Sequence, residues 1–217
     1  NKIYLDAFER TETANGGRYY DAEDMLIEKI NSGHLLIDYV GHGSTRSWTH
    51  EKILDFAKIE KLTNKRLPVM ITATCDFGRF DAKERSGGEM FAINPNGGAI
   101  AMFTTVRVVY SGANDGLNIA FIDNIFKKDD QNRPLTLGEI MRKAKVARGT
   151  DSNKLRFTLL GDPAIRMSYP GNQYKVNIKT INDIDVSSAT PNIKALSNNV
   201  IKGEIIDIDN NVVSDFN

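Results

Sequence analysis

The fold prediction starts from HLLIDYVGHGSTRSW, residues 34–48, in which the apolar run Leu35–Val40 ends at a histidine between two glycines. LPVMITATCDFG, residues 67–78, has the same form and leads into Cys75, the only cysteine. Both runs belong to a set of apolar segments separated by helical patterns, an alternation typical of parallel strands in an α/β fold. The predicted strands are Ile3–Phe8, Leu35–Val40, Val69–Thr74 and Ala99–Thr105.

Between and after these strands, apolar residues recur at helical spacing. Thr49 is the possible N-cap of the second predicted helix, and Thr136 with Glu139 has capping-box spacing at the last. The sequence LRFTLLGDPAIRMSYP, residues 155–170, predicts a strand, a turn and another strand. The residues that share helical faces are Ala22, Met25, Leu26 and Ile30; Ile53, Phe56 and Ala57; Leu117, Ala120, Phe121 and Ile125; and Leu137, Ile140, Met141, Ala144 and Ala147.

Composition excludes several classes of protein. The 217 residues include 28 Lys and Arg and 28 Asp and Glu, so no basic surplus indicates a nucleic-acid partner. No apolar run approaches the roughly 18 residues of a membrane-spanning helix. A single cysteine forms no internal disulfide, and a first residue other than Met leads us to expect a piece of a longer protein.

The pattern of polar and apolar residues changes near residue 170. YKVNIKTI and NNVIKGEIIDIDNNVV alternate polar and apolar residues and carry Asn and Asp turns, the pattern of a β-sandwich. We therefore expect an α/β domain over residues 1–170 and the incomplete start of an immunoglobulin-like β domain over residues 171–217. DIDNN, residues 207–211, is interpreted as a hairpin turn, because Val212 replaces the glycine of a calcium loop.

The residues that carry chemistry follow two strands that are consecutive among those predicted. In open α/β sheets functional groups collect at the carboxyl ends of strands, where His42 and Cys75 both fall. An imidazole can take the thiol proton and return it to a leaving amine, so the pair is a candidate cysteine nucleophile with its general base. The backbone N–H groups of Gly43 and Cys75 are candidate oxyanion donors. Taken singly, such a cysteine is usually a packing residue and such a histidine a solvated one.

Four residues are candidates for the substrate pocket. Trp48 can wall the site beside His42, although packing under a loop explains it equally well. Thr104, Thr105 and Val106 leave a strand toward the same edge of the sheet. No metal or other cofactor is expected, because a strand length separates His34 from the other two histidines, His42 and His50.

The motifs resemble those of a known family. YVGHGS followed by Trp48, and ITATCDFGRFD, resemble the histidine and nucleophile motifs of gingipain-type cysteine peptidases of the caspase-like clan. KIYLDAF, TATCDFGRFD, TTVRVVYSG and LLGDPAIRM further resemble the PorU-type sortases of the Bacteroidetes type IX secretion system, over residues 1–170. The resemblance implies a caspase-like, mainly parallel sheet flanked by helices, followed by an immunoglobulin-like domain.

The resemblance also implies a function. Such an enzyme removes the C-terminal sorting domain of secreted cargo and transfers the new carboxyl end to an amine on anionic lipopolysaccharide. It acts at the outer-membrane surface with attachment-complex proteins as partners. His42 would be the general base and acid, Cys75 the nucleophile that forms a thioester, and the Gly43 and Cys75 backbone the oxyanion hole.

Two questions stay open at the level of the sequence. The acid that orients the histidine lies upstream in the family, and Asp6, Asp38 and Asp76 are local candidates with ordinary structural explanations. The alternative to an enzyme is a catalytically silent caspase-like module that binds partners at the cell surface.

Overall fold

The computed structural model describes residues 2–14, 16–168, 173–193 and 197–214. The chain divides into two compact units, Asn1–Ser168 and Tyr169–Asn217, and each is described by itself. Within the described residues, every helix is too short or too polar to cross a lipid bilayer.

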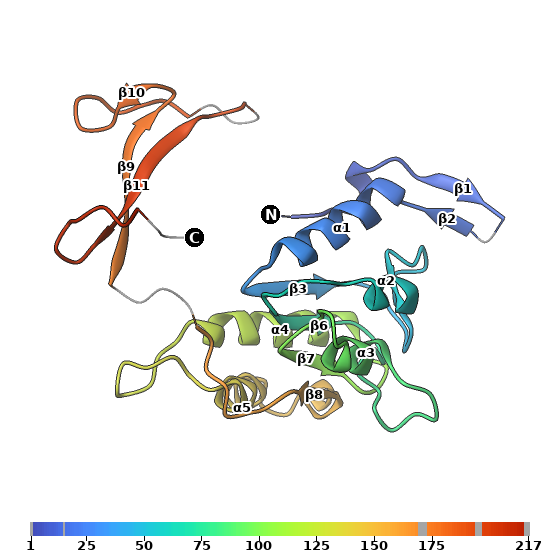
Figure 1. The fold of residues 1–217 in the computed structure, drawn as a ribbon. Coiled ribbons are helices and arrows are strands. Elements are labelled where there is room, and N and C mark those ends of the chain that lie inside the picture. Colours follow the sequence, from blue (N-terminus) through green and yellow to red (C-terminus); the bar gives the residue numbers. More distant parts are fainter. Residues whose placement is uncertain (1, 15, 169–172, 194–196, 215–217) are drawn as a thin grey trace. The chain divides into compact units, whose positions relative to one another are not determined.

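The first unit is built on a four-stranded sheet in the order β3-β6-β7-β8 (Figure 1). The strands are β3 (Leu36–Val40), β6 (Val69–Ala73), β7 (Ala101–Thr105) and β8 (Phe157–Leu160). β3, β6 and β7 are parallel, and β8 is antiparallel to β7. The predicted mostly parallel sheet is therefore confirmed, and all four of its strands coincide with predicted ones, β8 being the first strand predicted within residues 155–170.

Helices cover both faces of this sheet, and every residue of its central strands β6 and β7 is buried. Met70 and Met102 point into a cluster with residues of α1, α2 and α3. On the other face, the ring of Phe103 stacks 4.6 Å from that of Phe121 in α4, and α5 packs beside α4. The helices are α1 (Tyr20–Ser32), α2 (Phe56–Glu60), α3 (Gly87–Ile93), α4 (Ser111–Ile125) and α5 (Leu137–Ala147).

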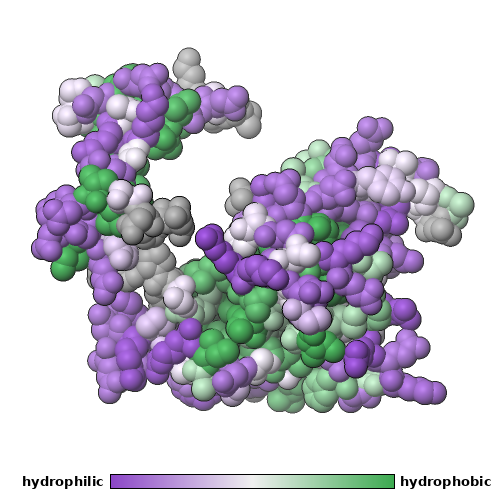
Figure 2. Space-filling model, viewed as in Figure 1, coloured by the Kyte–Doolittle hydropathy of each residue, from purple (hydrophilic) through white to green (hydrophobic). Residues whose placement is uncertain are grey.

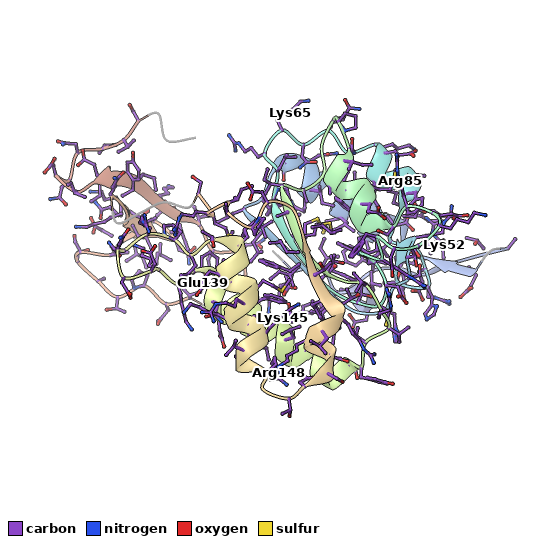
Figure 3. The ribbon with its side chains drawn as sticks, turned by 90° about the horizontal axis from the view of Figure 1, so that it is seen from below. Lys52, Lys65, Arg85, Glu139, Lys145 and Arg148 are labelled. Atoms are coloured by element: carbon purple, nitrogen blue, oxygen red, sulfur yellow. The ribbon has the colours of Figure 1, made fainter. Side chains whose placement is uncertain are left out.

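Short elements complete the first unit. η1 (Leu5–Ala7) and η2 (Ser152–Arg156) are 3-10 helices. Two small antiparallel pairs are formed by β1 (Thr11–Thr13) with β2 (Gly16–Arg18), and by β4 (Ser47–Trp48) with β5 (Leu54–Asp55). Lys145 of α5 points toward β8, where its ammonium group donates to the Phe157 carbonyl at 2.7 Å (Figure 3).

The predicted strand Ile3–Phe8 is wrong. The segment contains η1 instead, and within the described residues it has no strand partner. Ile3 and Leu5 pack against the core cluster, which explains why the segment is apolar without belonging to the sheet. A strand needs a ladder of backbone hydrogen bonds, and apolar pattern alone does not report whether a partner is present.

One helix start and one capping box also differ from the sequence prediction. α2 begins after Asp55, whose carboxylate accepts the Lys58 N–H at 3.2 Å, so Thr49 is not its cap. Thr136 caps α5 as predicted, but Glu139 binds Arg142 rather than the cap residue.

The last predicted strand of the first unit is also wrong. After the turn that begins at Gly161, the described chain forms only an isolated bridge between Thr136 and Arg166. Tyr169 and Pro170, at the end of that prediction, lie outside the described residues.

The second unit contains a three-stranded antiparallel sheet in the order β10-β9-β11. The strands are β9 (Tyr174–Ile181), β10 (Ile184–Asp185) and β11 (Ile201–Asp207). The predicted turn at residues 207–211 is confirmed, because the Asp207 N–H donates to the Asn211 carbonyl at 2.9 Å. The immunoglobulin-like assignment stays a prediction.

Apolar residues also reach the surface of the first unit. Figure 2 shows them gathered in the region of α4 and the start of β3. Leu35, just before β3, Ile119 in α4 and Phe126, just after α4, are exposed. β3 is also an edge strand in the described sheet, so one side of it has no strand partner there.

The loop that precedes α5 allows a test of acid stability. Asp129 accepts backbone N–H bonds from Arg133 and Gln131 and pairs with the Arg133 and Arg166 side chains. The Arg133 N–H bond is the largest cause that lowers the pKa of Asp129 from 3.8 to about 2. Because the pKa is lower in the folded state, ionised Asp129 stabilises the fold above about pH 4 and loses this effect toward pH 2.

We therefore expect Asp129→Asn to weaken the fall in urea midpoint between pH 4 and pH 2. Circular dichroism at a series of pH values measures this, and Asp130→Asn is the matched control. Identical acid profiles for the wild type and Asp129→Asn would contradict the prediction.

Candidate active site

His42 and Cys75 follow neighbouring strand ends. β3 and β6 are parallel and in register, with Val40 opposite Ala73. Each chain continues for two residues beyond that pair to reach His42 or Cys75, and the Gly41 N–H still donates to the Ala73 carbonyl at 3.4 Å. The predicted adjacency of the two strands is confirmed, and the two residues occupy equivalent positions at one edge of the sheet.

The backbone of His42 is held on both sides. Its carbonyl accepts the Tyr39 hydroxyl at 2.6 Å and the Thr49 N–H at 2.8 Å. The side chain is exposed, and its ring centroid lies 5.5 Å from that of His50. The strand end therefore fixes the main chain of the histidine while leaving the imidazole accessible to solvent.

The sulfur of Cys75 contacts a different loop. Cys75 is partly exposed, and its Sγ accepts the Val109 N–H at 3.5 Å and donates to the Val109 carbonyl at 3.7 Å. Across the residues that the structure describes, no hydrogen bond joins this sulfur to His42. The two residues thus follow neighbouring strand ends, and their side chains make no direct hydrogen bond among the described residues.

The two N–H groups predicted as oxyanion donors have no protein acceptor among the described residues. Gly43 faces Trp48 in an antiparallel bridge whose hydrogen bonds lie on either side of the pair. These hydrogen bonds are donated by the Ser44 N–H to the Ser47 carbonyl and by the Thr49 N–H to the His42 carbonyl, so neither uses the Gly43 N–H. Free donors on adjacent strand ends are what an oxyanion site requires.

Gly43 is also required by packing. A Cβ atom at this position would lie 2.4 Å from Thr74 Oγ1 and 3.1 Å from the Ser47 carbonyl oxygen. The loop of residues 41–48, which we call the histidine loop, therefore packs directly on Thr74, the residue before Cys75. This close approach, in addition to the substrate access inferred from the sequence, explains why the position lacks a side chain.

The first unit of the chain matches a known peptidase family. The chain matches the model described as peptidase family C25 over residues 1–168. The chain belongs to peptidase family C25. This is the gingipain family of cysteine peptidases, so family membership supports cysteine peptidase chemistry. No curated protein sequence matches the C25 chain.

Solved structures share its fold. The crystal structure of the Arg-specific cysteine proteinase gingipain R is 21% identical, with a TM-score of 0.60 over 72% of this chain and 39% of that one. The complex of Porphyromonas gingivalis RgpB pro- and mature domains is 20% identical, with a TM-score of 0.60 over 72% and 40%. A structure described as a protease is 20% identical, with a TM-score of 0.59 over 70% and 39%. The C25 chain thus spans about two fifths of these relatives and shares their mixed α/β fold.

The four pocket candidates lie in different environments. Trp48 is 1% exposed and stacks on Tyr39 at 4.2 Å, so it packs in the core. Thr104 and Thr105 are fully buried, where Thr104 bonds Thr72 and Thr105 bonds the Thr74 carbonyl. Val106 is half-buried, and its N–H donates to the Arg156 carbonyl.

A cavity of about 820 Å³ adjoins the histidine. His42 and Trp48 line it together with residues of α1, β3 and the segment Lys2–Leu5. The cavity is lined by neither Cys75 nor the three candidates that follow β7, Thr104 to Val106. Of the predicted pocket residues, Trp48 alone borders this space.

None of the three local acids hydrogen-bonds to His42 within the described part of the chain. Asp38 accepts the Asn118 amide of α4 at 3.0 Å, and partial desolvation raises the pKa of its carboxyl group. Asp6 is exposed in η1, and Asp76 has a φ of 56° and donates its N–H to the Arg107 carbonyl. Glu51 lines the cavity together with His42 and was not singled out from the sequence.

Sequence reasoning missed two neighbours of the candidate catalytic residues. His50 was weighed only as a metal ligand, and its ring lies beside that of His42. Val109 contacts the sulfur through its backbone, and a backbone contact leaves no signal in residue type. The stretch VRVVYSG after β7 was the available indication that this loop approaches the site.

Proposed function

We propose that the chain carries the catalytic residues of a cysteine endopeptidase, with Cys75 as nucleophile and His42 as general base and acid. The observation that supports this most directly is the register of β3 and β6, which brings both residues to one sheet edge beside two free N–H donors. Membership of the C25 family agrees with it.

The reaction would proceed through an acyl-enzyme. The Cys75 sulfur attacks the carbonyl of the scissile peptide as His42 takes the thiol proton, and the Gly43 and Cys75 N–H groups stabilise the oxyanion. The C–N bond then breaks, and the leaving amine receives the proton from His42. A thioester on Cys75 remains, which either water or an acceptor amine resolves.

The finer proposal is a PorU-type sortase. The motifs KIYLDAF, TATCDFGRFD, TTVRVVYSG and LLGDPAIRM support it. The leaving group would be the C-terminal sorting domain of type IX cargo, and the acceptor an amine on anionic lipopolysaccharide. This activity would take place at the outer-membrane surface, with attachment-complex proteins as partners and the immunoglobulin-like domain following the peptidase domain.

The alternative is a catalytically silent surface-binding module of the same fold. One observation favours it, namely that the Cys75 sulfur bonds Val109 and not His42 in the described conformation. The reactivity of Cys75 distinguishes the enzyme from the binding module, because a thiolate reacts with alkylating reagents and a thiol does not.

Mild treatment of the full-length native protein with iodoacetamide, followed by intact mass, tests the proposal. We expect selective alkylation of Cys75 that His42→Ala slows by about tenfold or more, since a positioned base contributes on that order. His34→Ala is the matched control, because that residue precedes β3 and should leave the rate unchanged. A thiol that stays inert in the native protein would favour the binding module.

A further inference from the structure

The segments that follow β6 and β7 run side by side in opposite directions. The Gly78 N–H donates to the Thr105 carbonyl at 2.8 Å, and the Asp76 N–H donates to the Arg107 carbonyl at 3.4 Å. The Val109 N–H then reaches the Cys75 sulfur at 3.5 Å. We call residues 75–81 and 105–109 the paired loops. The contact of Val109 with the sulfur is the last of the hydrogen bonds between them.

An ion pair joins the same two loops through side chains. The two terminal nitrogens of the Arg107 guanidinium group, Nη1 and Nη2, donate to the Asp81 carboxylate at 2.9 and 2.5 Å. Hydrogen bonding to Arg107 is the largest cause that lowers the pKa of Asp81. Arg107 also donates to the Val106 carbonyl at 2.5 Å. A two-pronged pair fixes the direction of the guanidinium as well as its distance, and the Arg107 backbone is already bonded to Asp76.

We infer that Arg107 and Asp81 are positioning residues, whose ion pair holds the Val109 peptide against the Cys75 sulfur. The inference rests on the proposed role of Cys75 as nucleophile. Arg107 lies two residues before Val109, so rotation of the loop at Arg107 moves the peptide that contacts the sulfur. Neither Arg107 nor Asp81 touches the sulfur, and both act through the paired loops.

The contact restrains where the sulfur lies. The Val109 N–H donates to the sulfur, and the Val109 carbonyl accepts from it. Both groups restrict the side chain to one place at the sheet edge. Loss of the ion pair should therefore lower turnover, which depends on the attack geometry, more than substrate binding.

The experiment uses the full-length protein and a cargo protein that ends in a C-terminal sorting domain. Hydrogen exchange at the Val109 amide reports the loop directly, and cleavage followed by mass spectrometry gives kcat and KM. We expect Arg107→Ala and Asp81→Asn to speed Val109 exchange by about 3- to 10-fold and to lower kcat by about tenfold or more at similar KM. Arg107→Lys should recover part of kcat, and Asp81→Arg combined with Arg107→Asp should restore slow exchange.

Arg142→Ala is the matched control, because it removes a similar two-pronged pair with Glu139 on α5 (Figure 3). It should change neither exchange nor kcat. Unchanged Val109 exchange in Arg107→Ala, or an effect confined to KM, would overturn the inference. If wild-type protein leaves cargo intact while Val109 exchange still responds, the proposed function fails and the loop contact is supported.

Discussion

Cys75→Ala is expected to abolish release of the sorting domain from cargo while leaving the protein folded. Among the described residues, the side chain that would be lost hydrogen-bonds to the Val109 backbone alone, and it is partly exposed. Its removal should therefore change stability by about 1 kcal/mol or less. In the proposed mechanism catalysis depends on the sulfur itself, because the substitution leaves nothing to form the thioester. We expect a fall in cleavage rate of about 10³-fold or more.

The measurement is the mass of cargo after incubation with the full-length variant, with circular dichroism as the test of folding. Cys75→Ser keeps a hydrogen-bonding atom at the position and should be almost as inactive, which separates nucleophilicity from packing. Cargo processed at the normal rate by Cys75→Ala would rule out the enzymatic assignment. Cargo product whose mass exceeds that of the hydrolysed product by the mass of an amine minus water would further support transfer over hydrolysis.

Trp48→Ala is expected to lower the free energy of unfolding by about 3–5 kcal/mol, the usual cost of removing a large buried aromatic side chain. The indole is 1% exposed and lies parallel to the Tyr39 ring at 4.2 Å. Phe77 and Phe91 lie 5.6 and 6.4 Å from it, centroid to centroid. The variant would leave a void between these rings and the histidine loop.

Urea unfolding followed by far-ultraviolet circular dichroism measures this effect, because the variant lacks the only tryptophan and its fluorescence. Trp48→Phe should cost less, since a ring still fills part of the site and the Trp48 Nε1, buried without a partner in the described structure, is removed. Phe80→Ala is the control, because Phe80 is 55% exposed and should change stability by about 0.5 kcal/mol or less. Equal stability of Trp48→Ala and Phe80→Ala would contradict the packing described for this residue.

Much of the fold was predictable because its central strands are buried on both faces and are therefore mostly apolar. The predictions for β6 and β7 were correct to within two residues, and α4 and α5 were predicted from their apolar faces. The segment Ile3–Phe8 carries the same apolar signal, yet it packs as a coil with η1. The signal reports burial, and a sequence does not reveal whether a strand partner is present.

The part of the candidate site that lies at strand ends could be predicted from the sequence. His42 and Cys75 stand out by residue type and by their place after apolar runs, and parallel pairing of β3 with β6 brings them to one edge. The contact of Val109 with the sulfur is made by its backbone, so residue type does not indicate it. Thr104 and Thr105 were expected to face a pocket, but their hydroxyl groups hydrogen-bond inside the sheet.

The helix α4 links the two halves of the site. It begins at Ser111, two residues after the peptide that contacts the sulfur, and its Asn118 donates to Asp38 on the strand that leads to His42. A substitution that slides this helix along its axis would therefore displace Cys75 and His42, the proposed nucleophile and base, relative to each other. Distant changes on α4 can thus alter turnover without altering either reacting group, which makes the helix a place where activity could be tuned during evolution.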